Sequence, residues 1–325
     1  MAISTDSVAQ SYRKLIDIRT AISSVVLGQD ELISGLLIAA MTNNHALIEG
    51  LPGLAKSLAV STFADTIESS FTRIQFTPDL LPADLTGTQI FDPRDTQFHT
   101  RKGPIFSNVI LADEINRAPA KVHSALLEAM EETSVTIGGN TLELPNPFLV
   151  LATQNPIEHE ATYRLPEAQL DRFMLKIVVK YPEVKDERSM LDQKLSRARV
   201  SPKSVISAAE LQAIQEVVRQ INIDPKIRDY ILRLVRASRI ADEEEEGDIS
   251  RWIEYGASPR ASICFVEGTQ ALAVLNSREY VLPEDVKQIA KTILRHRLVL
   301  TYQAEAEGIT TDDVIDQLLE NVPIP

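Results

Sequence analysis

The sequence predicts an α/β protein with a parallel sheet, followed by a smaller helical domain. In the first half, short apolar runs alternate with segments of helical periodicity, which is typical of parallel strands joined by crossover helices. A glycine-containing loop connects the first of these runs to a helix. After about Tyr181 the strand signals end and capped helical segments follow.

Composition agrees with a soluble globular protein of about two domains, since domains average about 150 residues. The chain has 325 residues, of which 44% are hydrophobic and 24% charged, so a disordered or fibrous class is disfavoured. A formal net charge of −13 and the lack of a basic stripe argue against general nucleic-acid binding. No signal peptide is evident, and residues 32–41 form too short an apolar run to span a bilayer. The single cysteine, Cys264, cannot form an internal disulfide, which fits a reducing compartment. Together these features lead us to expect a cytoplasmic protein without membrane insertion.

The predicted sheet has five buried strands with helices between them. An amphipathic helix over 7–25, opened by Asp6, precedes the sheet. The apolar runs at 46–49, 73–76, 109–112, 148–153 and 174–179 are the candidate strands, and helices are expected at 55–68, 120–132 and 167–172.

Two stretches interrupt this alternation. Residues 76–105 are rich in proline and glycine and are expected to form an insertion with a hairpin around 92–95. Residues 134–144 carry a Gly-Gly-Asn turn between two β-prone runs and predict a second hairpin.

In the second domain, helices are expected to start at Ser207 with Glu210, at Asp224-Pro225, at Pro283 and at Thr310 with Asp313. The acidic run 242–246 is expected to be a solvated loop between helices.

Residues 50–57 have the pattern of a phosphate-binding loop, Gly50-Leu51-Pro52-Gly53-Leu54-Ala55-Lys56-Ser57, between an apolar strand and a helix. Backbone N–H groups of such a loop converge on phosphates. Lys56 is expected to reach the β- and γ-phosphates, and Ser57 to ligate Mg²⁺. Ala55 replaces the usual glycine, and we expect a right-handed helical backbone there. The alternative is a Gly-Pro turn with an unrelated lysine.

Two later strands end in polar residues at the edge where α/β proteins bind ligands. The run at 109–112 is followed by Asp113, expected to hold magnesium through water, and Glu114, expected to activate the attacking water. The run at 148–153 leads to Asn155, which can bind the attacking water or the γ-phosphate, with Thr153 as a weaker candidate. The alternatives are ordinary polar turns after each strand.

Two arginines are candidates for phosphate contacts. Arg172, at the end of a short helix, could neutralise charge that builds on a transferring phosphoryl group. Its alternative fate is a surface ion pair with Asp171 or Glu167. Arg260, in the first turn of a helix in the second domain, could report nucleotide state to that domain or be a solvated arginine.

Taken in order, these motifs resemble those of AAA+ ATPases, and within them the MoxR family. The similarity rests on the phosphate loop, on 76–82, on Asp113-Glu114-Ile115-Asn116-Arg117-Ala118, on 165–173, on 258–261 and on 294–298. It covers nearly the whole chain from about Val26. The resemblance implies a nucleotide-binding core at 1–185 with a second-helix insert and a hairpin before the sensor strand, and an all-α lid at 186–325.

The resemblance further implies an ATPase that uses ATP and Mg²⁺, forms homo-hexameric rings and works with von Willebrand factor A-domain proteins in maturation or metal loading of clients. Arg172 would be the arginine finger for a neighbour's ATP, and residues 26–29 would contact adenine. Arg164 is a possible second interface arginine. Arg117 is expected as a surface residue that leads a helix, with a position at the subunit interface as the alternative. Open alternatives are a non-hydrolysing scaffold and a DNA-acting motor. The implied nucleotide contacts are Val26, Gly28, Gly50, Pro52, Gly53, Leu54, Ala55, Lys56, Ser57, Leu58, Asp113 and Arg260.

Overall fold

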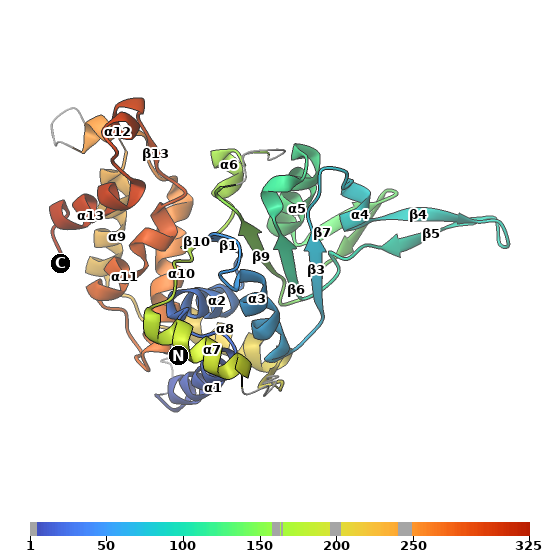
Figure 1. Cartoon of the computed structure of the whole chain (residues 1–325), viewed down its shortest axis with the longest axis horizontal. Coiled ribbons are helices and arrows are strands. Elements are labelled where there is room, and N and C mark those ends of the chain that lie inside the picture. The colour runs from blue at the N-terminus through green and yellow to red at the C-terminus, as the bar shows by residue number, and fades with distance from the viewer. Residues whose placement is uncertain (1–4, 158–162, 164, 196–202, 240–248) are drawn as a thin grey trace. The chain divides into compact units, whose positions relative to one another are not determined.

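A five-stranded sheet forms the centre of the larger part of the chain (Figure 1). The computed structural model describes residues 5–157, 163, 165–195, 203–239 and 249–325. The strand order is β10-β1-β9-β6-β3, and β1, β9, β6 and β3 pair in parallel. Their bounds are β1 Ala46–Glu49, β3 Phe71–Gln75, β6 Val109–Asp113, β9 Leu149–Gln154 and β10 Leu175–Val178. The α/β fold predicted from the sequence is confirmed.

Helices cover both faces of this sheet, so its inner strands β1, β9 and β6 are mostly apolar and end in polar or charged residues. All five residues of β6 are buried, as expected for a parallel strand packed on two sides. One face packs on α5 (Ala120–Glu132) through a core that joins Ile110 and Val150 to Val122 and Leu126. On the other side of the strands are α2 (Asp30–Thr42) and α3 (Lys56–Asp65). No helix was predicted over α2, because residues 32–41 are apolar on all sides and give no amphipathic period.

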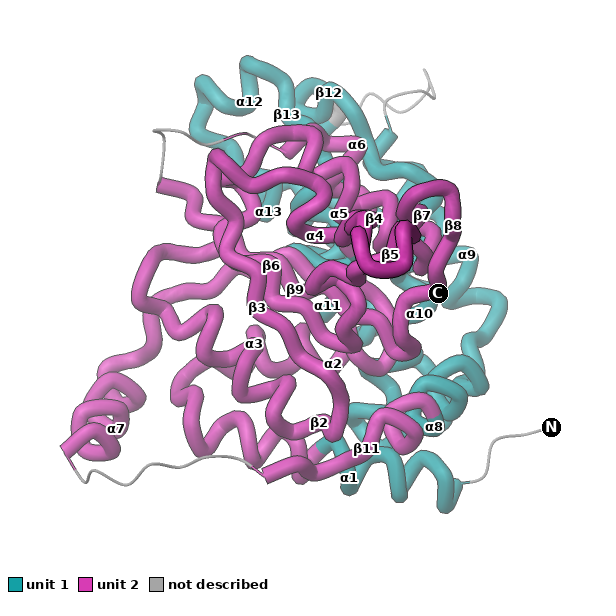
Figure 2. Tube along the Cα trace, turned by 90° about the vertical axis from the view of Figure 1, so that its right-hand side faces the viewer, with its two compact units in different colours: residues 1–15, 174–176, 213–325 teal, residues 16–173, 177–212 magenta. Residues whose placement is uncertain are grey.

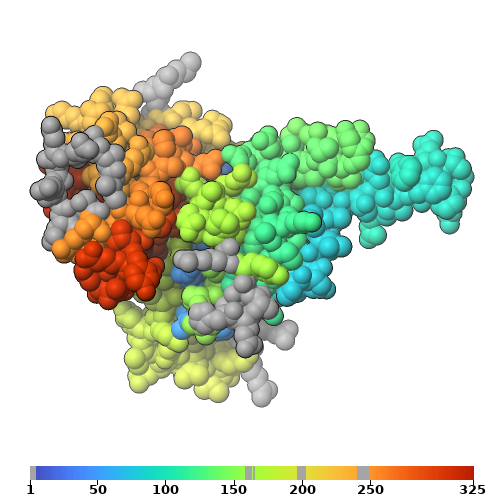
Figure 3. Space-filling model, turned by 90° about the horizontal axis from the view of Figure 1, so that it is seen from above, coloured from blue at the N-terminus to red at the C-terminus, as the bar shows by residue number. Residues whose placement is uncertain are grey.

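Two hairpins extend the sheet-bearing part. β4 (Gly87–Asp92) pairs with β5 (Gln97–Lys102) after the short helix α4 (Pro82–Thr86), which confirms a hairpin within the predicted insertion. This hairpin projects from the surface beside it (Figure 3). β7 (Ser134–Ile137) pairs with β8 (Asn140–Glu143), as the Gly-Gly-Asn turn predicts. The short strands β2 (Ile67–Glu68) and β11 (Ile206–Ser207) pair in parallel.

The remaining elements are mostly helical. The chain divides into two compact units: unit 1 holds residues 1–15, 174–176 and 213–325, and unit 2 holds 16–173 and 177–212 (Figure 2). The helices α1 (Thr5–Ser23) and α8 (Ala208–Arg219) contribute to both units. Unit 2 also has α6 (Glu167–Leu170), α7 (Val184–Leu195) and the 3-10 turn η1 (Ile115–Arg117). The domain boundary predicted from the sequence, between residues 185 and 186, stays a prediction.

Unit 1 is built mainly from helices that start at the predicted caps. Asp224 caps α9 (Pro225–Ala237) by accepting the Lys226 N–H, and Thr310 caps α13 (Thr311–Asn321). The other elements are α10 (Pro259–Leu275), α11 (Pro283–Leu294), α12 (Tyr302–Ala306), η2 (Ser250–Trp252) and the strand pair β12 (Ile253–Tyr255) with β13 (Val299–Leu300). The predicted cap at Ser207 with Glu210 is also present, at the start of α8. The acidic run 242–246 and Arg164 lie outside the described residues.

Candidate active site

The loop over residues 50–57 connects β1 to α3 at the carboxyl end of the sheet. Gly53 adopts a positive φ of 84°, which favours glycine. Ala55 also adopts a positive φ, 57°, so the right-handed backbone expected there is wrong. The turn into α3 places this residue in the left-handed region, which explains why the usual pattern has glycine before the lysine. The loop therefore keeps its expected position at the cost of a strained alanine.

Lys56 is the first residue of α3, and its ammonium group lies against carbonyl oxygens at the mouth of the loop. Nζ donates to the carbonyl oxygens of Gly50, of Leu51 at 3.4 Å and of Gln154 at 3.2 Å. Gln154 is the last residue of β9, so these bonds tie the loop to the neighbouring strand. The positive charge predicted for phosphate binding is held at the sheet edge where the strands end.

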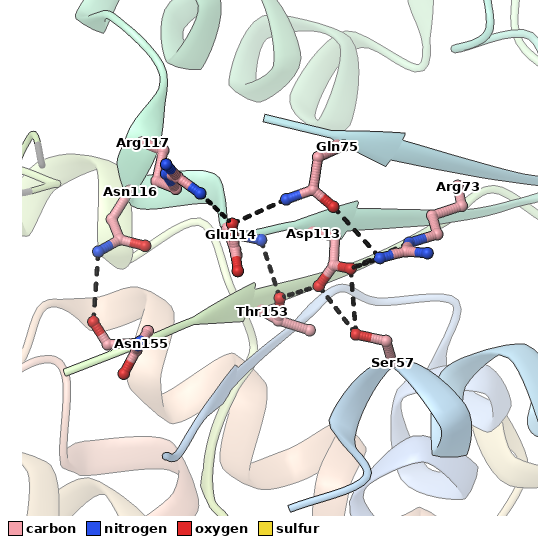
Figure 4. A network of polar contacts seen from close by, with 9 residues as sticks. All are labelled: Ser57, Arg73, Gln75, Asp113, Glu114, Asn116, Arg117, Thr153 and Asn155. Atoms are coloured by element: carbon pink, nitrogen blue, oxygen red, sulfur yellow. Dashed lines mark hydrogen bonds and ion pairs between the residues drawn. The ribbon is translucent and has the colours of Figure 1, made fainter. Parts of the chain in front are cut away.

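Asp113 is buried and accepts hydrogen bonds from three other side chains (Figure 4). Ser57 Oγ lies 2.9 Å from Oδ1, Thr153 Oγ1 lies 2.6 Å from the same oxygen, and Arg73 Nη2 lies 2.6 Å from Oδ2. Burial by itself raises the pKa of Asp113, but the hydrogen bonds from Thr153, Arg73 and Ser57 outweigh it and hold this pKa below its ordinary value. The carboxylate is therefore anionic at neutral pH.

Glu114 follows Asp113 in a left-handed conformation, with φ of 56°. This turn carries the chain from β6 into η1, and the Glu114 N–H donates to Thr153 Oγ1 at 2.9 Å. Its carboxylate accepts hydrogen bonds from Gln75 Nε2 at 2.8 Å and from Arg117 at 2.9 Å (Figure 4). The two acids thus share Thr153 as a common partner, which gives this residue a larger structural role than the sequence suggested.

Asn155 is buried just beyond the end of β9, as expected for a side chain delivered by that strand. Its Oδ1 accepts the Ile157 N–H at 3.3 Å, and its main-chain oxygen accepts Asn116 Nδ2 at 3.3 Å. The first of these bonds is the turn favoured by Asn-Pro. This turn is therefore compatible with a role of Asn155 in positioning the attacking water or the γ-phosphate.

Arg172 is bound to α5. Its guanidinium donates to the Leu127 carbonyl oxygen at 2.7 Å and pairs with Glu131 at 3.0 Å. An ion pair was the alternative considered for this residue, but the acid is Glu131 rather than Asp171 or Glu167. Arg172 also lines a cavity of about 310 Å³, together with Glu128, Glu131 and Glu132. Its assignment as an arginine finger stays a prediction.

The other proposed nucleotide contacts are in different environments. Pro52 and Leu58 are exposed, Leu54 and Val26 are buried, and Gly28 has a positive φ of 69°. Arg260 belongs to unit 1, in the first turn of α10, where its N–H donates to Ser258 Oγ at 3.2 Å. Its role toward nucleotide stays a prediction.

Three residues of the acidic network were missed in the sequence or given another role: Arg73, Gln75 and Arg117. Arg73 and Gln75 lie two residues apart on β3, which pairs with β6 so that Gln75 is opposite Asp113. The sequence pattern that could have revealed them is a pair of polar residues two positions apart in a β-prone run, because residues at this spacing lie on the same face of a strand. Arg117 was expected as a surface residue and is partly exposed, but its ion pair with Glu114 was not predicted.

Comparisons with known proteins show which family the chain belongs to. Residues 45–175 match the family described as "ATPase family associated with various cellular activities (AAA)", and residues 245–318 match the AAA lid domain. The chain is 46% identical over 307 residues to "Chaperone MoxR1" of Mycobacterium tuberculosis, covering 94% of this chain and 80% of that protein.

The chain belongs to the MoxR family of AAA+ ATPases. It is also 30% identical to "Protein MoxR" of Paracoccus denitrificans, over 98% of each chain. A solved structure of a candidate ATPase from Cytophaga hutchinsonii matches this MoxR-family chain with a TM-score of 0.91 and 45% identity, covering 98% of this chain and 97% of that one. Among the described residues, no helix has the length and apolarity to cross a membrane.

Proposed function

We propose that this MoxR-family protein hydrolyses ATP with Mg²⁺ and uses the cycle for chaperone-like remodelling, maturation or metal loading of client proteins. The observation that carries the proposal is the bond between Ser57 and Asp113, 2.9 Å long, which joins the phosphate loop to the acidic end of β6. A hydroxyl and a carboxylate held together are oxygen ligands of the kind that Mg²⁺ prefers. The lowered pKa of Asp113 keeps its negative charge available.

Each side chain has a separate task in this proposal. Lys56 and the N–H groups of the phosphate loop bind the phosphates, and Mg²⁺, when bound by Ser57 and Asp113, neutralises charge on them. Glu114 accepts a proton from the attacking water, and Asn155 orients that water. Val26 and Gly28 contact the base, and Arg260 senses the nucleotide from the lid.

The proposal includes a homo-hexameric ring in the cytoplasm, with Arg172 as the arginine finger for the adjacent subunit. The guanidinium is held at α5 by Glu131 and the Leu127 carbonyl, so it is ordered on one subunit before any neighbour is engaged. An arginine at this place would stabilise charge in the transition state. A von Willebrand factor A-domain protein is the proposed partner. The name of "Chaperone MoxR1" supports the chaperone-like part.

We place the client surface on the β4–β5 hairpin. Phe91 and Phe98 are opposite each other on this hairpin, with ring centroids 5.3 Å apart, and they are 48% and 65% exposed. Exposed aromatic pairs are unusual on a solvent-facing strand and are typical of binding surfaces.

Phosphate release from ATP, with and without Mg²⁺, tests the proposed function. Mg²⁺-dependent release supports it, whereas ATP binding without release would favour the non-hydrolysing scaffold. Repeating the assay with double-stranded DNA at physiological salt tests the DNA-acting motor. Strong stimulation by DNA would favour the motor, while the proposed function predicts none, because the chain carries a formal net charge of −13.

A further inference from the structure

Asn116 is a buried polar residue beside the acidic pair that the proposed mechanism leaves unused. It lies in η1, two residues after Glu114, and is 4% exposed. Its main-chain oxygen accepts the Tyr163 N–H at 2.7 Å, and its Nδ2 donates to the Asn155 carbonyl oxygen at 3.3 Å. Asn116 therefore connects the turn that carries Glu114 to the strand end that carries Asn155.

The other half of this amide is unsatisfied. Asn116 Oδ1 is buried and accepts no hydrogen bond from any part of the chain that the structure describes. A buried oxygen without a donor destabilises the fold, so such groups are rare in folded proteins and each calls for an explanation, of which a catalytic role is one.

The orientation of the amide is fixed by its neighbour. Rotating the group by half a turn would bring Asn116 Oδ1 against the Asn155 carbonyl oxygen, and two acceptors repel each other. Nδ2 must therefore face Asn155, and Oδ1 lies on the side of the residue toward Glu114 (Figure 4). The unsatisfied oxygen is therefore on the side of the amide that faces the proposed base, while Nδ2 holds the main chain of the proposed sensor.

We propose that Asn116 is a further catalytic residue of the ATPase, whose Oδ1 accepts a hydrogen bond from the water that Glu114 activates. The inference rests on the proposed function. A water has two protons: one is taken by Glu114, and the other needs an acceptor that fixes the direction of attack. Asn116 Oδ1 supplies that acceptor, while Nδ2 keeps Asn155 in position.

Asn116→Leu tests the acceptor, because leucine has a similar volume and no polar atoms. Mg·ATP affinity is expected to stay within about threefold of wild type, since the phosphate loop is untouched. Turnover is expected to fall by about 10- to 100-fold, on the scale of a group that acts in proton transfer. Unchanged turnover in a folded variant would overturn the inference and leave the proposed function intact. Absence of phosphate release from the wild type would overturn both.

His123→Leu is the matched control for damage to the turn. His123 Nε2 bonds to the Ile115 carbonyl oxygen at 2.6 Å, so this variant weakens the same η1 turn without removing Asn116. It is expected to lower thermal stability with a much smaller loss of turnover than Asn116→Leu. Equal losses of turnover at equal losses of stability would show that Asn116 only supports the turn, and would contradict the inference.

Discussion

Thr153 and Asp113 are joined by a hydrogen bond of 2.6 Å, from the threonine hydroxyl to Oδ1 of the carboxylate. The same hydroxyl oxygen accepts the N–H of Glu114 at 2.9 Å. One residue of β9 thus fixes the two consecutive acids at the end of β6, and it does so because β6 and β9 are neighbours in the sheet. The geometry of the proposed metal ligand and the proposed base depends on this shared partner.

Replacing Ala55 with glycine should stabilise the protein. Ala55 has a φ of 57°, and a left-handed backbone costs an L-residue about 1–2 kcal/mol. Part of that gain is lost to the greater freedom of glycine in the unfolded chain, so we expect an increase of up to about 1 kcal/mol in the free energy of unfolding. Urea denaturation measures it. The control is Ala59→Gly inside α3, expected to destabilise by about 1 kcal/mol or more, and a matching loss at position 55 would argue against the strain.

His45 should make the fold sensitive to mild acid. The ring is buried, accepts the Val150 N–H at Nδ1 and bonds to the Met130 carbonyl through Nε2. Burial lowers the pKa of His45 to about 4. The unfolded chain therefore binds a proton from about pH 6.5 downward that the folded chain does not, so stability is complete above that pH and falls toward pH 4, by about 3 kcal/mol.

His45→Gln isolates this contribution. Its stability should be lower than that of the wild type at pH 7.5 but flatter between pH 7 and pH 4, as followed by denaturant titration. His123 also has a pKa lowered by burial, and it remains in both proteins, so its contribution cancels in the difference. An identical pH dependence in the two proteins would rule out His45 as the titrating group.

The sheet could be predicted because most of its strands carry short apolar runs. The candidate site could be predicted because Asp113 and Glu114 come at the end of one such run, and Lys56 and Ser57 close the glycine-containing loop that follows another. The network around those acids could not be predicted in full. Arg73 and Gln75 reach Asp113 and Glu114 only through the register of β3 on β6, which a local pattern does not encode. The backbone of Ala55 was mispredicted because alanine's helical preference is overridden by the shape of the loop.

Serine in place of both Phe91 and Phe98 tests the client surface. Both rings are exposed on one face of the β4–β5 hairpin, so basal ATP turnover should stay within about twofold of wild type while partner association weakens. Proteins that co-purify with a slow-hydrolysis Glu114→Gln background provide the measurement. The control is Ile90→Ser, which alters the opposite face of the same hairpin. Loss of basal turnover would show that the hairpin shapes the ring instead.

Mixing two inactive variants tests whether the site is shared between subunits. Arg172→Ala should bind nucleotide but hydrolyse it about 10³-fold more slowly or worse, on the arginine-finger scale. Lys56→Ala should fail to bind nucleotide. In mixed rings, some interfaces combine an intact phosphate loop from the first variant with an intact arginine from the second, so activity should return. No recovery in rings shown to be mixed would assign Arg172 to its own subunit, in agreement with a purely structural pair with Glu131.

The central claim is that Glu114 activates water at a site that holds Mg·ATP, and Glu114→Gln tests it most directly. The amide keeps the size of the side chain and a hydrogen-bonding oxygen but cannot take a proton at neutral pH. Equilibrium binding of Mg·ATP and single-turnover hydrolysis should be measured on the same preparation. The account predicts near-normal binding with hydrolysis at least about 10²-fold slower than in the wild type. Hydrolysis at a near-normal rate would contradict the account, because the base would then lie elsewhere.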